Sequence, residues 1–177
     1  PTDLKKSRIM ANLMIDQAEL LGFLQENGFS FASGVPCSYF TPMVNELQKD
    51  NAISYVPATI EDEAIGIASG VAFGGKRSFV IMQNSGYATI GDALTSLAQL
   101  YRLPMLILVS YRGLEPDKDF PEHSLMGEVT EDSLKSYRVP YWDLEEEDWQ
   151  ATMESAIAKM EEISKPGALL VREGVLE

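Results

Sequence analysis

The chain contains little cysteine, little histidine and few positive charges. Its one cysteine excludes an internal disulfide framework and is compatible with a reducing compartment. Lys and Arg total 14 against 27 Asp and Glu, and the formal net charge of −13 argues against nucleic acid or an anionic membrane surface as the partner. No apolar run reaches the roughly 18 residues that a membrane helix needs, and the polar start is not that of a signal peptide. We therefore expect a cytoplasmic protein.

Several familiar catalytic and nucleotide-binding motifs are also missing. The chain has no GxGxxG, GxxxxGK[ST] or GxSxG sequence, so it has no glycine-rich diphosphate cradle of its own. His123 is the only histidine, which means that no Ser-His-Asp set can use another base. With a single distant cysteine it cannot anchor a zinc site of the usual composition either. We expect no metal site within this chain.

Helical and strand patterns alternate along the 177 residues, a length that suits one domain with a sizeable core. The patterns predict strands at 29–35, 53–57, 78–82, 105–110, 139–142 and 168–172, and helices at 12–27, 39–49, 61–73, 88–101, 128–137 and 145–163. An irregular stretch at 111–127 is long enough to be functional. We predict an α/β fold: a single-domain three-layer α/β/α arrangement with a six-stranded parallel sheet, its core at about 12–172.

In such a sheet, ligands bind beyond the carboxyl ends of the strands. Turns at 34–38, 58–61 and 83–86, and the stretch from 111 onward, should lie there. Glu61 opens the helix at 61–73, which is rich in small residues. One interpretation is a helix-start carboxylate that gains a few tenths to about 1 kcal/mol from the helix dipole, with Thr59 as cap. The other is a buried carboxyl that shares a proton with a ligand nitrogen.

The turn at 83–86 offers the side chains of Gln83, Asn84 and Ser85 together with backbone N–H groups, which suit an anion or a carbonyl oxygen. A plain N-cap is the alternative. The turn at 34–38 is similar, and Ser38 could cap the helix after it. Cys37 has no neighbouring base in sequence, so we expect a small packed thiol there.

Arg112 and His123 fall in the irregular stretch. An Arg just past a buried strand could form a fork onto a carboxylate, phosphonate or sulfonate, or could pair with a nearby acid such as Glu115 or Asp119. A loop histidine is more often solvated than catalytic.

Taken together, four segments resemble the pyrimidine-binding domain of thiamine diphosphate decarboxylases. They are GVPCS at 34–38, EDEAIGIASG at 61–70, MQNSG at 82–86 and YRGLEPDKDFPEHSLMG at 111–127. The resemblance covers about 12–172 and is strongest toward sulfopyruvate decarboxylase alpha subunits and the N-terminal half of phosphonopyruvate decarboxylases. It departs after MQNSG, where Tyr87, Ala88 and Thr89 replace the Gly and Asn common in the phosphonopyruvate enzymes.

The resemblance implies a thiamine diphosphate site in which Glu61 contacts N1′ of the aminopyrimidine and favours its imino tautomer, so that the cofactor can lose its C2 proton and accept electrons while CO₂ leaves. Asp62 and Glu63 flank Glu61, but the nine-residue spacing to Gly70 favours Glu61. By the same resemblance, Gln83, Asn84 and Ser85 bind cofactor, and Ser38, Asn84, Ser85 and Arg112 bind substrate. His123 would be a second catalytic residue, an acid that protonates an intermediate.

The resemblance also implies a partner. The family's GDG…N motif, which holds Mg²⁺ and the diphosphate, does not occur here. A beta subunit would therefore supply the Mg²⁺ and diphosphate site, in a hetero-oligomer. The expected reaction is decarboxylation of 3-sulfopyruvate to sulfoacetaldehyde. Alternatives are a 3-phosphonopyruvate decarboxylase subunit giving phosphonoacetaldehyde, a carboligase subunit, and a non-catalytic regulatory pyrimidine-domain protein.

Overall fold

The computed structural model describes residues 14–49, 52–115 and 119–177. Within these ranges six strands form one sheet, and every neighbouring pair is parallel. The sheet has the order β2-β1-β3-β4-β6-β5. Its strands are β1 (Phe29–Gly34), β2 (Ser54–Pro57), β3 (Arg77–Gln83), β4 (Leu106–Ser110), β5 (Tyr141–Leu144) and β6 (Gly167–Val171). The predicted six-stranded parallel sheet is confirmed.

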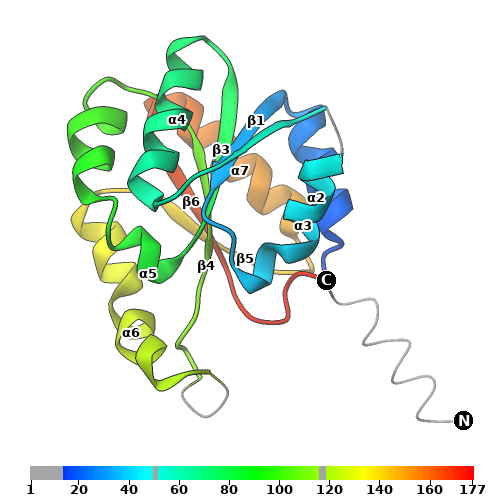
Figure 1. Cartoon of the computed structure of the whole chain (residues 1–177), viewed down its shortest axis with the longest axis vertical. Helices are drawn as coiled ribbons and strands as arrows, with labels where there is room; N and C mark the ends of the chain where they lie inside the picture. Colours follow the sequence, from blue (N-terminus) through cyan, green and yellow to red (C-terminus); the bar gives the residue numbers. More distant parts are fainter. Residues whose placement is uncertain (1–13, 50–51, 116–118) are drawn as a thin grey trace, which may run out of the picture.

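Helices cover both faces of this sheet, which confirms the three layers. One layer contains α2 (Gln17–Glu26), α3 (Thr41–Lys49) and α7 (Trp149–Ile163). The opposite layer contains α4 (Glu61–Phe73), the π-helix η2 (Ala93–Gln99) and α6 (Pro121–Ser136). Figure 1 shows α4, the one-turn α5 (Asn84–Tyr87) and α6 to the left of the sheet, and α2 and α3 to its right. No helix in the described ranges is both long and apolar enough to span a membrane.

Two hydrophobic cores lie between the sheet and its helical layers. Along β3, Phe79 and Ile81 belong to the core on the α2 side, and Val80 and Met82 belong to the core on the α4 side. Strands β4 and β6 are buried over their whole length, as expected for parallel strands covered on both faces. Each buried aliphatic side chain contributes about 1.5–3 kcal/mol. The sheet is therefore a rigid support for the turns at its edge.

The carboxyl ends of the central strands lie side by side, as predicted. Gly34 pairs with Pro57 across β1 and β2, and Gln83 pairs with Ser110 across β3 and β4. The turns that follow these strands therefore share one edge. In Figure 1 this is the lower edge, where α5 and the start of α6 lie.

Two predicted helices differ strongly from those observed, and two others begin later than predicted: α2 begins at Gln17 and α7 at Trp149, where helices were expected from 12 and 145. The helix expected at 128–137 begins at Pro121, because Pro at the first helical position has a φ already suited to the helix and lacks an N–H that would be unpaired there. His123 therefore lies in the first turn of α6, and the irregular loop is shorter than predicted. The helix expected at 88–101 is shorter than predicted: its helical residues run from 91 to 99, most of them in the π-helix η2, and the one-turn α5 precedes it. Positions 12 and 13 of the first predicted helix lie outside the described residues.

Candidate active site

The three acids that begin α4 have different surroundings. The N-cap residue, Ile60, offers no side-chain hydrogen bond. Instead, the Glu63 carboxylate accepts a hydrogen bond from the backbone N–H of Thr59, with Oε2 2.6 Å from the nitrogen. Glu63 therefore performs the capping role that the sequence left open for Thr59 and Glu61. Glu61 is half-buried and receives no hydrogen bond from the described residues, and the buried Oδ1 of Asp62 has no partner among them.

Glu61 lies against the turn that follows β3. A Cβ built on Gly86 would overlap the Glu61 side chain, with Oε1 as the nearest atom. The turn thus approaches the carboxylate so closely that a side chain at position 86 could not be accommodated without movement. The structure brings together the two features that the sequence singled out, the carboxylate of α4 and the turn at 83–86.

Gln83 and Ser85 are half-buried and lie on this turn. Gln83 donates from Nε2 to the Ser85 hydroxyl over 2.8 Å. The two side chains therefore fix each other on the turn whose Gly86 lies against Glu61, and Gln83 is the residue that precedes α5.

Asn84 is completely buried and links the turn to the rest of the edge. Its Nδ2 donates to the carbonyl of Arg112 over 2.9 Å and to the hydroxyl of Thr130 over 3.0 Å. Its Oδ1 has no partner among the described residues. Both donors of Asn84 therefore hold neighbouring elements together, and its unpaired oxygen is itself buried within the chain.

Arg112, directly beyond β4, is paired within the chain. Its Nη2 lies 2.8 Å from Oδ1 of Asp119 and its Nε 3.3 Å from Oδ2, a bidentate arrangement. Its guanidinium also stacks on Tyr39, 5.5 Å from the ring centroid. The ion pair with Asp119, one of the two alternatives left open by the sequence, is present. A guanidinium has five N–H donors, so part of the fork still remains for an anion.

Asp119 also holds His123, a connection that the sequence analysis missed. The His123 Nδ1 lies 2.8 Å from Oδ1 of Asp119, and the two residues are four positions apart. That spacing is the signal that could have revealed the pair, but it is informative only once a helix is known to start at Pro121. A Cβ on Gly113 would overlap the backbone carbonyl of His123, so the loop and the first turn of α6 are in close contact.

Hydrogen bonds determine the charge of Asp119. Its side chain is only 6% exposed, and burial alone would raise its pKa. Hydrogen bonds from Arg112, His123 and the backbone N–H groups of Phe120 and Gly113 outweigh burial and hold the pKa of Asp119 well below its usual range. The carboxylate is therefore ionised at neutral pH and accepts hydrogen bonds only.

Ser38 and Tyr39 come from the turn after β1. Ser38 is exposed at the start of the 3-10 helix η1 (Ser38–Phe40) and lines a cavity of about 350 Å³. Burial, and next the charge of Glu173, raise the pKa of Tyr39 to about 12, so its phenol stays protonated at neutral pH. Cys37 packs against the core and donates to the Ser110 hydroxyl over 3.2 Å, as expected for a packed thiol.

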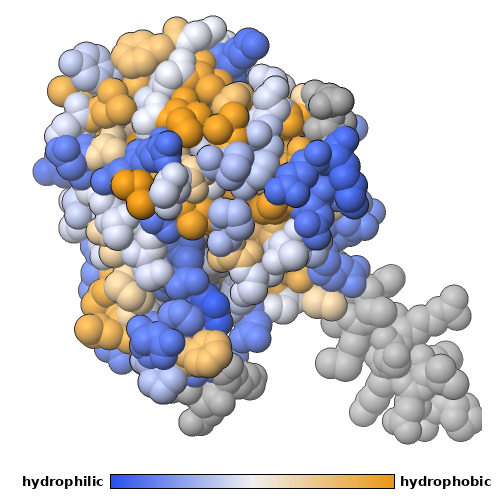
Figure 2. Space-filling model, viewed as in Figure 1, coloured by the Kyte–Doolittle hydropathy of each residue, from blue (hydrophilic) through white to orange (hydrophobic). Residues whose placement is uncertain are grey.

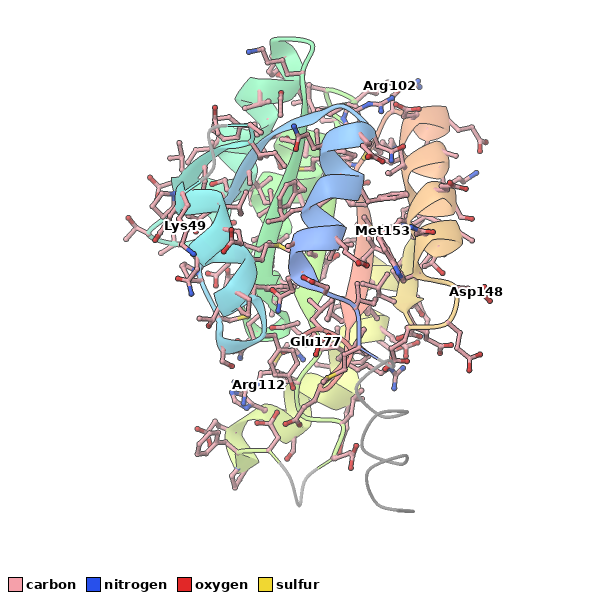
Figure 3. All side chains as sticks on the ribbon, turned by 90° about the vertical axis from the view of Figure 1, so that its right-hand side faces the viewer. Lys49, Arg102, Arg112, Asp148, Met153 and Glu177 are labelled. Atoms are coloured by element: carbon pink, nitrogen blue, oxygen red, sulfur yellow. The ribbon has the colours of Figure 1, made fainter. Side chains whose placement is uncertain are left out.

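The predicted residues thus form two groups connected by Asn84. One contains Glu61 and the turn at 83–86, and the other contains Arg112, Asp119 and His123 beside Tyr39. Figure 3 shows Arg112 at the lower end of the molecule near α6, at the opposite end from Arg102. A cavity of about 520 Å³ borders the second group and is lined by Tyr39, Tyr111, Arg172 and five carboxylate residues, Glu115, Asp119, Glu145, Glu146 and Glu173. Within the described part of the chain, no group of three or more His, Cys, Asp or Glu side chains could hold a metal ion.

The sequence of this chain was compared with known protein families, and one family matches the part that contains the site. Residues 17–135 match the family described as "Thiamine pyrophosphate enzyme, N-terminal TPP binding domain". The chain belongs to this family. The matched residues include all the candidate site residues, from Ser38 to His123. Thiamine pyrophosphate is the same compound as thiamine diphosphate, so the resemblance stated from the sequence motifs is confirmed.

Relatives of this thiamine pyrophosphate domain divide into two groups. The phosphonopyruvate decarboxylase of Streptomyces viridochromogenes is 40% identical over 121 residues, which are 68% of this chain but 30% of that protein. The sulfopyruvate decarboxylase subunit alpha of Methanocaldococcus jannaschii is 32% identical over 148 residues, 83% of this chain and 87% of that subunit. The corresponding subunit of Methanococcus maripaludis is 34% identical over 117 residues, 66% of this chain and 70% of that subunit.

Solved structures share the fold of this domain at lower identity. Benzoylformate decarboxylase from Polynucleobacter necessarius superposes with a TM-score of 0.73 and 18% identity, over 91% of this chain and 30% of that one. The thiamine diphosphate-dependent 4-hydroxybenzoylformate decarboxylase of Rhodococcus jostii RHA1 gives a TM-score of 0.67 and 18% identity, over 92% of this chain and 31% of that one. These likenesses show that the fold is that of the family.

The observed residues fit the pyrimidine part of the cofactor. Glu61 is a carboxyl group that receives no hydrogen bond from the described residues. It lies against Gly86, whose lack of a side chain gives the carboxyl group its space. A carboxyl group of this kind can exchange a proton with a ring nitrogen. Gln83 and Ser85 add polar groups on the turn that contains Gly86.

Proposed function

We propose that this chain is the alpha subunit of a thiamine diphosphate-dependent 2-oxoacid decarboxylase that converts 3-sulfopyruvate to sulfoacetaldehyde and CO₂. The observation that carries the proposal is the position of Glu61 against Gly86, in a domain of the thiamine pyrophosphate family. The two sulfopyruvate decarboxylase alpha subunits described above support the assignment to a subunit.

In this proposal, Glu61 holds or releases a proton at N1′ of the pyrimidine ring. Gln83 and Ser85 orient that ring through polar contacts, and the buried Asn84 holds their turn in place. When bound, thiamine diphosphate supplies the nucleophile and the electron sink that decarboxylation requires. His123 would donate a proton to the substrate-derived group, and general acid–base steps of this kind contribute about 10²–10⁴-fold in rate.

A partner subunit would complete the site. The motif that holds Mg²⁺ and the diphosphate in this family does not occur in these 177 residues, and the sulfopyruvate decarboxylase relatives that they cover to 70% and 87% are named as alpha subunits. We propose that a beta subunit provides it and that the two chains form a hetero-oligomer. Glu61, at the first residue of α4, would then face a cofactor bound between the chains.

Charge favours a sulfonate over a phosphonate as the substrate tail. Arg112 is the proposed anion-binding residue, but Asp119 neutralises it, and the neighbouring cavity is lined by five acidic residues against one arginine. A phosphonate, by analogy with a phosphate ester, carries about 1.5 to 2 negative charges at pH 7, whereas a sulfonate carries one. The surrounding carboxylates should repel the more highly charged tail more strongly. 3-Phosphonopyruvate remains the second candidate because two relatives that act on it are 40% identical to this chain.

The test is reconstitution with a beta-type chain, thiamine diphosphate and Mg²⁺, followed by an assay of aldehyde from each of the two 2-oxoacids. We expect sulfoacetaldehyde, and we expect Glu61→Gln to reduce kcat by at least about 100-fold. Glu63→Gln is the matched control. It makes the same charge change in the same helical turn, but Glu63 bonds to the backbone N–H of Thr59 and is not proposed to contact the cofactor. Acyloin products would instead indicate a carboligase subunit. Absence of turnover with any partner would favour the alternative that the chain is a non-catalytic regulatory pyrimidine-domain protein.

A further inference from the structure

We propose that Asp119 is a positioning residue that fixes the tautomer of His123, so that Nδ1 carries the hydrogen and Nε2 presents its lone pair. The role of His123 in turnover rests on the proposed function, but the tautomer does not. The observations are the 2.8 Å hydrogen bond between Asp119 Oδ1 and His123 Nδ1 and the saturation of the Asp119 carboxylate by other donors.

Donor counting shows that Asp119 acts through its neighbours. Oδ1 accepts from Arg112 Nη2, from the Phe120 N–H and from His123, and Oδ2 accepts from Arg112 Nε and from the Gly113 N–H. Five donors therefore occupy about four lone-pair sites. With its side chain only 6% exposed, Asp119 has no free acceptor for a substrate. The side chains that it positions are those of Arg112 and His123.

The same geometry decides which imidazole nitrogen is protonated. An ionised carboxylate can only accept, so the hydrogen of this bond must reside on Nδ1. The ring is 14% exposed, and its other nitrogen, Nε2, is then an acceptor in the neutral ring and a donor only after it takes up a proton. Asp119 thus determines the nitrogen through which His123 can exchange a proton with a ligand. It also holds Arg112 in the same arrangement, which couples the anion-binding group to the proton-exchanging group.

The chain offers an unusually direct test because His123 is its only histidine. We would label histidine with ¹⁵N and record the two imidazole nitrogen shifts of the full chain at about pH 8, without partner, cofactor or substrate. We expect Nδ1 to have the shift of a protonated nitrogen and Nε2 that of an unprotonated one. In Asp119→Ala the population should move toward the Nε2–H form, while Glu122→Gln, an exposed neighbour of His123, should leave it unchanged. A wild-type chain in the Nε2–H form would overturn the proposal even if Asp119→Ala fails to fold.

Turnover provides the second test if the proposed function holds. We expect Asp119→Asn to lower kcat at least tenfold in the reconstituted enzyme and to have less than a twofold effect on kcat in a His123→Gln background, because residues that act through one another are not additive. Loss of the contact between Asp119 and Arg112 should instead raise KM in both backgrounds. An equal effect of Asp119→Asn in both backgrounds would overturn the positioning role. Absence of turnover in the wild-type enzyme would count against the proposed function alone, since the tautomer is measured on the isolated chain.

Discussion

At the scale of the residue, three carboxylates near one edge of the sheet differ in what they can do because they differ in their neighbours. Glu63 caps the start of α4, and Asp119 accepts hydrogen bonds from five donors. Glu61 receives none from the described residues and lies against Gly86. A carboxylate that is saturated with donors stays ionised, whereas one without donors is open to a ligand. Of the three, Glu61 is therefore suited to exchange a proton with a cofactor.

The saturated state of Asp119 predicts a pH-dependent contribution to stability. The folded-state pKa of Asp119 lies below its unfolded value, so its contribution is present above about pH 4 and is lost as the pH falls toward the folded pKa. We expect Asp119→Asn to lower the free energy of unfolding at pH 7 by about 2 kcal/mol, the usual range for hydrogen bonds to a charged group. The difference between variant and wild type should shrink below about pH 4. Urea unfolding at pH 7, 5 and 3.5 measures it.

Glu122→Gln is the control for this experiment, because Glu122 is exposed in the first turn of α6. It should change the free energy of unfolding by less than about 0.5 kcal/mol, as is usual at the surface. A deficit in Asp119→Asn that stays constant down to pH 3.5 would show that ionisation of Asp119 does not stabilise the fold.

At the scale of the element, the sequence predicts most where local signals are complete. The bounds of α4, Glu61–Phe73, agree with the prediction because acids mark its start and Gly74 and Gly75 its end. The start of α6 was wrong because Pro121 follows a loop that itself contains Gly and Pro, which hid a proline suited to the first helical position. The π-helix within 88–101 and the one-turn α5 before it have no comparable local signal.

Side-chain networks between elements were predicted least. The turn at 83–86 was recognised as a candidate site, but periodicity says nothing about a hydrogen bond from Asn84 to Thr130, 46 residues further along the chain. The same holds for Arg112, for which the sequence was compatible with an anionic ligand or with a nearby acidic residue as the partner. These contacts depend on the packing of α6 against the edge of the sheet, which no local pattern records.

The close approach of the turn to α4 can be tested at Gly86. In Gly86→Ala the new Cβ would overlap the Glu61 carboxylate, so either the turn or Glu61 must move. Because the overlapped atoms are the end of a flexible, half-buried side chain, Glu61 can turn aside, so we expect a loss of only about 1 kcal/mol in the free energy of unfolding, the low end for overpacked sites. We also expect at least a tenfold fall in kcat of the reconstituted enzyme. Chemical unfolding and the aldehyde assay measure the two effects.

Gly70→Ala is the matched control for the stability measurement. Gly70 lies in α4, where a Cβ would meet nothing within 4 Å, so alanine should keep or raise the stability of the isolated chain by up to about 1 kcal/mol. If Gly86→Ala were as stable and as active as wild type, Glu61 would not be confined by this turn.

At the scale of the whole molecule, exposed apolar residues and acidic residues occupy different regions of the surface. Figure 2 shows apolar residues gathered over α4, and exposed Phe73, Leu100 and Tyr101 belong to α4 and the segment after η2. Carboxylates instead line the large cavity at the opposite, carboxyl edge of the sheet. Since the formal net charge of the chain is −13, self-repulsion acts against the compact state wherever these charges are exposed.

This imbalance predicts that salt stabilises the isolated chain. Raising NaCl from about 0.01 M to 0.15 M shortens the screening length from about 30 Å to about 8 Å, which weakens repulsion between exposed carboxylates. We expect the midpoint of thermal unfolding to rise by a few degrees. Glu147→Gln, which removes one exposed charge from the acidic run at 145–148, should raise the midpoint at low salt and have little effect at 0.15 M. The buried pair of Arg112 and Asp119 is screened much less, so the deficit of Asp119→Asn should be similar at both salt concentrations. A midpoint that falls with added NaCl would mean that favourable surface ion pairs, rather than the excess of negative charge, dominate the electrostatics of the molecule.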